Sequence, residues 1–116
     1  MELIIATLPT RFTILKKEYK AYDACIFLQV LFRVEHDSLE YIYTLSCLFQ
    51  DDKEEVLFVK CNQRPEGMEE SAALFLYDLI GARTVFNLFK EEIHDMLEPE
   101  LQRHEYSYLR FVLLPV

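Results

Sequence analysis

The fold of this chain depends most on residues 71–80, which read SAALFLYDLI. Almost every residue in this stretch is apolar, and Asp78 is its only charge. A helix on a protein surface has an apolar stripe and a polar face, whereas a helix that is apolar all round is buried on several sides. The stretch therefore predicts a buried helix, and Glu69 and Glu70 precede it where acidic side chains favour the positive end of a helix dipole.

A second helix is predicted over residues 84–98, after a break at Gly81, because glycine commonly ends a helix or allows a kink. Pro99 is expected to close this second run. Its apolar side chains share one helical stripe, and its polar side chains fall on the other face. The stripe comprises Val85, Phe86, Leu88, Phe89, Ile93, Met96 and Leu97. The chain thus has two consecutive helices that need an apolar surface to pack against.

A period of two in the apolar residues predicts β-strands upstream of the helices. The clearest strand is Ala24–His36, whose even positions form one continuous apolar face. Leu39–Gln50 and Val56–Cys61 follow after short polar connections, which favour antiparallel pairing because parallel strands need a long crossover. The other face of the first strand is mixed, but Phe27 and Leu31 on it are apolar. We infer that something covers part of that face.

The two ends of the chain are less regular. Residues 3–15 predict one strand interrupted at Pro9, or an edge strand. Lys16–Lys20 is a basic, solvated patch and is expected to be a turn, and Leu109–Val116 is expected to be extended. Strands followed by helices indicate an α+β fold, with an antiparallel β-sheet of about four strands and two helices packed on one face. At 116 residues, residues 1–116 are expected to form a single domain.

Composition disfavours several classes of function. The formal net charge of −8 argues against nucleic-acid binding, because a phosphate backbone needs clustered cations. The N-terminus lacks the basic segment of a signal peptide, and no apolar run reaches the ~18 residues of a membrane span. Cys25, Cys47 and Cys61 lie in strand-like segments and are expected to be buried, reduced thiols. We therefore expect a cytoplasmic protein without membrane insertion.

No pattern in the sequence predicts catalysis. Glu91, His94 and Glu98 place three possible metal ligands on one helix face, but di-iron bundles use such a motif on facing helices. Here the motif occurs once, on the face expected to be wet, which favours solvated ion pairs. Cys47 could form a nucleophile pair with a histidine, but a packed thiol is favoured because nothing is placed to activate it. We therefore expect a non-enzymatic protein with no cofactor and no metal.

Aromatic residues are numerous: the chain has seven tyrosines and nine phenylalanines. The core is the favoured position for any one of them, but together they exceed what one sheet face and two helices can easily hide. Such a surplus suggests an oligomer interface or a hydrophobic binding surface. Phe27 and Leu31 are the predicted oligomer-interface residues, because two helices cover only one sheet face well. A symmetric dimer is the commonest solution to this problem.

Three segments in the second half of the chain share a pattern with a known family. They are Gly81–Arg83, the aromatic-rich run Val85–Met96 and the terminal Leu113–Val116. Together they resemble the second half of the SecB export-chaperone family, and the upstream hairpin and linker come in a similar order, so the resemblance covers residues 22–116. Asn87-Leu88 stands where the family usually carries a proline, and the loop at 99–107 is more charged. The family's last helix, and the tail that contacts the export motor SecA, have no counterpart here.

The resemblance implies a non-enzymatic protein that holds unfolded polypeptide clients in hydrophobic grooves, mainly by burying apolar area. It also implies a homo-oligomer, either a dimer or a dimer of dimers, that serves export or a toxin–antitoxin system. The groove residues carried over by the resemblance are Tyr43, Leu45, Phe49, Phe58, Phe86 and Phe89. The alternative is a small regulatory or interaction subunit, in which the apolar surface is one fixed interface to a single partner.

Overall fold

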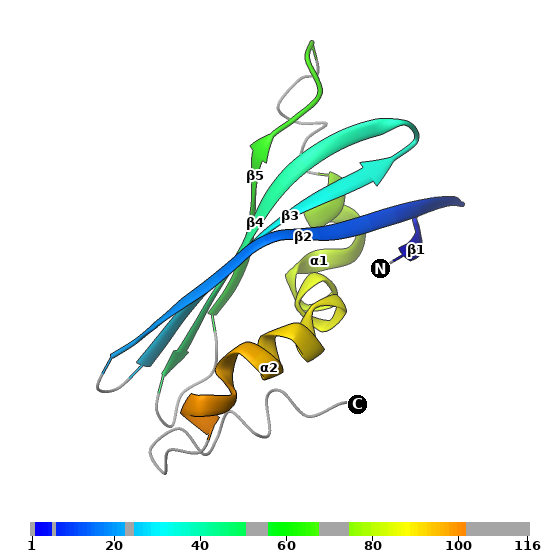
Figure 1. Ribbon diagram of the computed structural model, residues 1–116. Helices are drawn as coiled ribbons and strands as arrows, with labels where there is room; N and C mark the ends of the chain where they lie inside the picture. Colours follow the sequence, from blue (N-terminus) through cyan, green and yellow to red (C-terminus); the bar gives the residue numbers. More distant parts are fainter. Residues whose placement is uncertain (1, 6, 23–24, 51–55, 68–74, 102–116) are drawn as a thin grey trace.

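A computed structural model of the chain shows a five-stranded antiparallel sheet followed by two helices (Figure 1). The structure describes residues 2–5, 7–22, 25–50, 56–67 and 75–101. In chain order the elements are β1 (Glu2–Ile5), β2 (Leu8–Ala21), β3 (Cys25–His36), β4 (Leu39–Gln50), β5 (Val56–Gln63), α1 (Phe75–Leu88) and α2 (Lys90–Leu101). The predicted α+β architecture, with an antiparallel sheet followed by two helices, is confirmed.

The sheet is a meander in which each strand pairs with its neighbour in sequence. β3 and β4 are joined by Asp37 and Ser38, which both have positive φ, as the common two-residue hairpin turn requires. This turn sets the register from His36↔Leu39 to Cys25↔Gln50. The even positions of β3 therefore lie beside the odd positions of β4, so the two predicted apolar faces form one continuous surface.

The N-terminal half differs from its prediction. Lys16–Lys20, expected to be a turn, belongs to β2, and the sheet has five strands instead of about four. The charged side chains extend into solvent while the backbone pairs with β3, and solvated side chains alone do not distinguish that arrangement from a turn. Pro9 is tolerated because it lies one residue before the first β3 pair, Thr10↔His36, and so interrupts no pairing with that strand.

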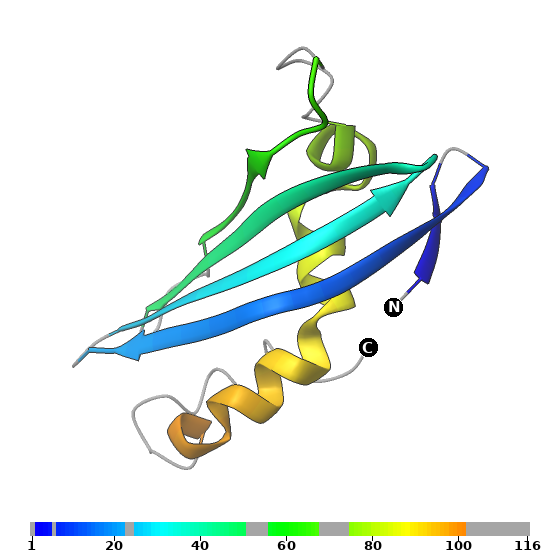
Figure 2. The same ribbon diagram turned by 45° about the horizontal axis from the view of Figure 1, so that its top comes forward.

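Both helices lie on the same face of the sheet (Figure 2). Gly81 makes a kink inside α1, with φ 76 and ψ 161, and the two helices separate at Phe89 instead of at residues 81–83. Pro99 lies inside the last turn of α2 instead of closing the helix, where a missing N–H removes a hydrogen bond only near the helix end. The start of the first predicted helix, residues 71–74, and the extended segment Leu109–Val116 lie outside the described residues.

The core fills the space between the sheet and the helices. The apolar faces of β3 and β4 are buried there, as are Ile5 and Phe12 from the N-terminal strands. The buried helical side chains are Val85, Phe86, Phe89, Ile93 and Leu97, with Leu88 and Met96 partly buried against them. The predicted apolar stripe is therefore the face that meets the sheet. Within the described part of the chain, neither helix combines the length and apolarity needed to cross a bilayer.

Candidate functional site

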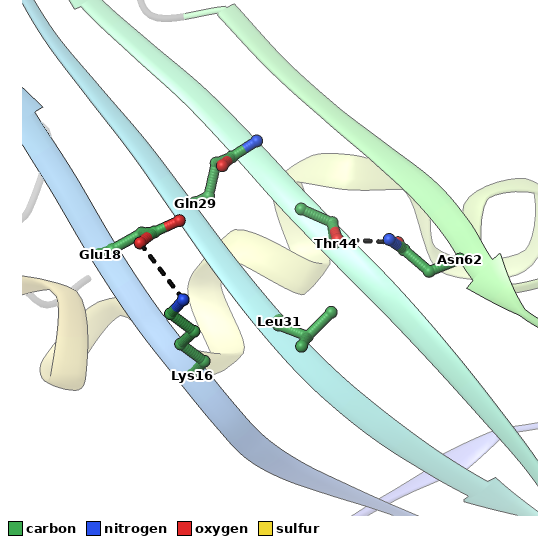
Figure 3. Close-up of a pocket in the computed structure, with 6 residues that line it drawn as sticks. All are labelled: Lys16, Glu18, Gln29, Leu31, Thr44 and Asn62. Atoms are coloured by element: carbon green, nitrogen blue, oxygen red, sulfur yellow. Dashed lines mark hydrogen bonds and ion pairs between the residues drawn. The ribbon is translucent and has the colours of Figure 1, made fainter.

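The helices leave one face of the sheet uncovered, and we call it the open face. Figure 3 shows six of its side chains on the near side of the sheet, with the helices behind. The open face consists of side chains that alternate with the core along β2, β3, β4 and β5. Its described members include Lys16, Glu18, Lys20, Cys25, Phe27, Gln29, Leu31, Arg33, Ile42, Thr44, Ser46, Leu48, Lys60 and Asn62.

Two shallow hollows cross the open face. The first has a volume of ≈ 260 Å³ and is lined by Lys16, Glu18, Gln29, Leu31, Thr44 and Asn62 (Figure 3). The second has a volume of ≈ 370 Å³ and is lined by Glu18, Tyr19, Lys20, Tyr22, Phe27 and Gln29. Glu18 and Gln29 line both hollows, so the two adjoin at β2 and β3.

Polar groups in the first hollow make contacts with one another. The Lys16 ammonium lies 3.6 Å from the Glu18 carboxylate, and both side chains are exposed. The Thr44 hydroxyl donates a hydrogen bond of 2.7 Å to the Asn62 side-chain carbonyl, which joins β4 to β5. These contacts lie at the surface, where water competes with each of them and an ion pair is worth little. A ligand could therefore exchange them for its own contacts at small cost.

Apolar side chains lie between these polar groups. Phe27 lies opposite Leu48 across β3 and β4, and Leu31 lies opposite Thr44. Phe27, Leu31, Ile42 and Leu48 are all partly exposed, since no described element packs over them. The structure thus brings both predicted oligomer-interface residues, Phe27 and Leu31, onto the open face. The surface offers apolar contact beside hydrogen-bonding groups, which suits a polypeptide better than a purely apolar ligand.

The structure places five of the six predicted groove residues in the core. Tyr43, Leu45, Phe49, Phe86 and Phe89 are all buried between the sheet and the helices, and the rings of Phe49 and Phe86 lie 6.2 Å apart. The core was the favoured position for each single aromatic side chain. A groove lined by these residues is closed here, so a client would reach them only if the helices moved away from the sheet.

Phe58 is the sixth predicted groove residue. Its backbone lies in β5, opposite Ser46 of β4, and its side chain lies outside the described residues.

The cysteines differ in accessibility. Cys47 is buried in the core. Cys25 is half-buried because it lies at the open face, and Cys61 is half-buried because it lies on β5 at the border of the sheet. Burial raises the pKa of Cys47 from 9.0 to about 12, and the nearby Arg83 charge offsets this only in part. The thiolate is the nucleophilic form, so Cys47 is a packed, unreactive thiol at neutral pH. Burial also raises the pKa of Cys61.

The histidine on α2 makes surface contacts with acidic neighbours. His94 Nε2 lies 3.7 Å from Glu98 Oε2, and His94 Nδ1 lies 3.7 Å from Asp95 Oδ1. Glu91, the third residue of the pattern, is exposed. Within the described ranges, no group of three or more His, Cys, Asp or Glu side chains could hold a metal ion.

Sequence reasoning missed the polar half of the open face. Lys16 and Glu18 lie in the segment that the sequence predicts to be a turn. The Thr44–Asn62 contact joins β4 to β5 beside a register shift between Ile42 and Tyr43. The available signal was the period-two pattern of β4, which places Thr44 on the same face as Ile42 and Ser46. Local alternation shows which residues share a face, but only the sheet order shows which faces become neighbours.

Comparisons of the chain with protein-family models, with curated proteins and with solved structures find no match.

Proposed function

We propose that this chain is a non-enzymatic, SecB-like protein that binds unfolded polypeptides. The open face is the observation that supports the proposal best. An unfolded chain presents apolar side chains and an unpaired backbone together. The open face offers Phe27, Leu31 and Leu48 for apolar contact, with the Gln29 and Thr44 side chains beside them as hydrogen-bonding groups. Binding by apolar burial and backbone hydrogen bonds does not require a particular client sequence.

The arrangement of layers supports the same function. Because both helices cover one face, the sheet can bind a ligand on its other face without disturbing the core. The closed groove around Phe86 and Phe89 is not needed for this binding mode. In this proposal the protein acts in the cytoplasm and serves either export or a toxin–antitoxin system. It would need no cofactor, because the work it performs is the reversible burial of apolar surface.

The proposal is tested by measuring light scattering while two unrelated denatured proteins are diluted into the purified chain. We expect the chain to suppress their aggregation, and the variant Leu31→Glu to lose most of this effect, because a carboxylate placed among apolar contacts must be desolvated. The matched control is Asn87→Glu, which adds the same charge at an exposed position on the helix side. Asn87→Glu should suppress aggregation as the unmodified chain does.

Two results would contradict the proposal. One is a soluble, folded chain that suppresses the aggregation of neither protein. The other is a Leu31→Glu variant that is as effective as Asn87→Glu. A chain that suppresses nothing yet forms a stoichiometric complex with a single protein would be the interaction subunit instead.

A further inference from the structure

The outer strand β2 is covered along only part of its length. β1 pairs with β2 from Glu2↔Arg11 to Ile5↔Leu8. From Phe12 to Ala21 no described strand pairs with β2 on that side, while β3 pairs with it on the other. Figure 2 shows this long segment of β2 at the border of the sheet. Such a border presents a row of backbone N–H and C=O groups that can pair with another strand.

The same strand is the basic part of an acidic chain. β2 contains four cations, Arg11, Lys16, Lys17 and Lys20, against the single anion Glu18, a net charge of +3, whereas the whole chain has a net charge of −8. The strand at the opposite border, β5, contains one cation, Lys60, and no anion. Charge therefore distinguishes the two borders of the sheet.

The lysines flank the border formed by residues 12–21 on both faces of the sheet. In the register with β3, Lys16 pairs with Leu31 and Lys20 with Phe27, which places both lysines on the open face. Lys17 pairs with Val30 of the core face and so lies on the helix side, and all three lysines are exposed. A strand added to this border would have cations beside it whichever way its own side chains point.

Apolar side chains are also exposed along this border. Leu15, at the bulge between Ile14 and Lys16, is 45% exposed, and Tyr22 is 54% exposed. Tyr22 and Phe27 also line the ≈ 370 Å³ hollow, together with Lys20. The border therefore fits a segment that mixes acidic and apolar residues better than one that is acidic throughout.

We propose that residues 12–21 of β2 bind an extended acidic segment of a partner protein by adding it to the sheet as a further strand. Backbone pairing would supply affinity and the lysines would select for carboxylates. A second copy of this chain is a poorer occupant, because self-pairing would place two segments side by side that each carry Lys16, Lys17 and Lys20 against Glu18, a net charge of +2. The binding mode differs from that of the proposed function, since the partner would pair with the backbone at the border while the clients would lie across the sheet, but Lys16 and Lys20 belong to both surfaces.

Lysines on a strand at a sheet border have another established role, which is to prevent association. The experiment must therefore distinguish a border that binds a partner strand from a border whose lysines only prevent association. The probe is a short fluorescent peptide in which glutamate alternates with valine, and the comparison peptide carries lysine at every glutamate position. Binding to the full-length chain is followed by fluorescence anisotropy.

We expect the acidic peptide to bind at least about tenfold more tightly than the lysine peptide, and added salt to weaken it. The triple variant Lys16→Glu, Lys17→Glu, Lys20→Glu should lose the acidic peptide and bind the lysine peptide instead. Since an unfolded acidic chain would also attract a lysine peptide, the new preference counts only if N-methylation of every amide in the lysine peptide abolishes it. N-methylation of every amide in the acidic peptide should likewise abolish its binding, because it removes the donors on both edges of the added strand.

Three results would overturn the inference. They are no preference for the acidic peptide, equal binding of the N-methylated peptide, and an unchanged preference in the triple variant. The Leu48→Glu variant separates this inference from the proposed function. Its carboxylate lies on β4, with β3 between it and the border, so it should bind the acidic peptide normally while failing to suppress aggregation. Sedimentation in the presence of the acidic peptide tests the competing occupant, since a fall in oligomer mass as the peptide binds would show that a second copy occupies the border.

Discussion

Phe89 is the residue at which the sheet and both helices converge. It lies between α1 and α2, and its carbonyl accepts a hydrogen bond of 2.9 Å from the Ile93 N–H. Its ring lies 4.9 Å from that of Phe32 in β3 and 6.5 Å from that of Phe12 in β2. One side chain therefore contacts two strands at the point where the chain turns from one helix into the next.

Phe89→Ala should lower the free energy of unfolding by about 3–5 kcal/mol, because it removes a buried ring and leaves a cavity. Urea denaturation measures the change, and Asn87→Ala is the matched control because Asn87 is exposed two residues away. The control should change stability by less than about 0.5 kcal/mol. If Phe89→Ala kept its stability and lost client binding, Phe89 would line an open groove in solution and its core position would be wrong.

The buried thiol of Cys47 makes the free energy of unfolding depend on pH in the alkaline range. Burial raises the pKa of Cys47 from 9.0 to about 12, so the folded state keeps its proton where the unfolded state has lost it. The stability that the buried, protonated thiol contributes is fully present below about pH 9 and is lost as pH rises towards 12. Stability should fall by up to about 1.4 kcal/mol per pH unit in that window, and the slope should be shallower in Cys47→Ala.

The measurement for Cys47 is a series of urea denaturations between pH 8 and pH 11. Tyr19 and Tyr41 also have raised pKa values, mainly because of burial, and their effect is common to both proteins. The difference between the parent and Cys47→Ala isolates the thiol. Equal slopes in the two proteins would show that Cys47 is not protected from ionisation by the fold.

At the scale of the element, the kink in α1 depends on the backbone conformation of Gly81. This residue has φ 76 and ψ 161, a conformation essentially restricted to glycine. A Cβ atom added at Gly81 would meet no atom within 4 Å, so a substitution would be strained by the backbone alone. The kink divides α1 into two helical segments, and it changes the direction in which the second segment packs.

Gly81→Ala should destabilise the protein by about 1–3 kcal/mol, the usual cost of a strained backbone conformation. The matched control is D-alanine at position 81, introduced by chemical ligation, because a D residue adopts positive φ without strain. D-alanine should restore stability, as measured by thermal unfolding. Equal destabilisation by both enantiomers would point to lost space around Gly81 instead of backbone strain.

At the scale of the whole molecule, the described elements leave the sheet with one helix-covered face and one open face, which predicts assembly. A second copy could cover Phe27 and Leu31, and a symmetric pair is the commonest way to do so. We expect sedimentation at micromolar concentration to show self-association, which Leu31→Glu reduces and Asn87→Glu does not. A clean monomer of 13.8 kDa would contradict this expectation and weaken the SecB-like proposal with it.

Self-association and client binding would use the same surface, so they should compete. Addition of an unfolded polypeptide should then lower the mass of the oligomer as measured by sedimentation. An oligomer that binds clients and keeps its full mass would place the contacts between copies elsewhere, such as the N-terminal strand or the helical layer.

The sequence alone determined the elements that depend on local pattern. The bounds of β3 and β4, to within one residue, and the antiparallel hairpin between them followed from the period of two and the short polar turn. The apolar stripe that includes Phe89 followed from helical spacing, as did the order of strands before helices. These features were predictable because side-chain alternation and helical spacing are properties of consecutive residues.

Only the tertiary structure decided which surfaces are covered. Tyr43 and Phe27 are both aromatic residues in strands whose side chains alternate between two faces. Tyr43 is buried and Phe27 is partly exposed, because both helices pack on the face that carries Tyr43. Lys16–Lys20 reads as solvated in either a turn or a strand, and only pairing with β3 distinguishes the two. Burial and strand pairing join residues far apart in the chain, so local spacing cannot specify them.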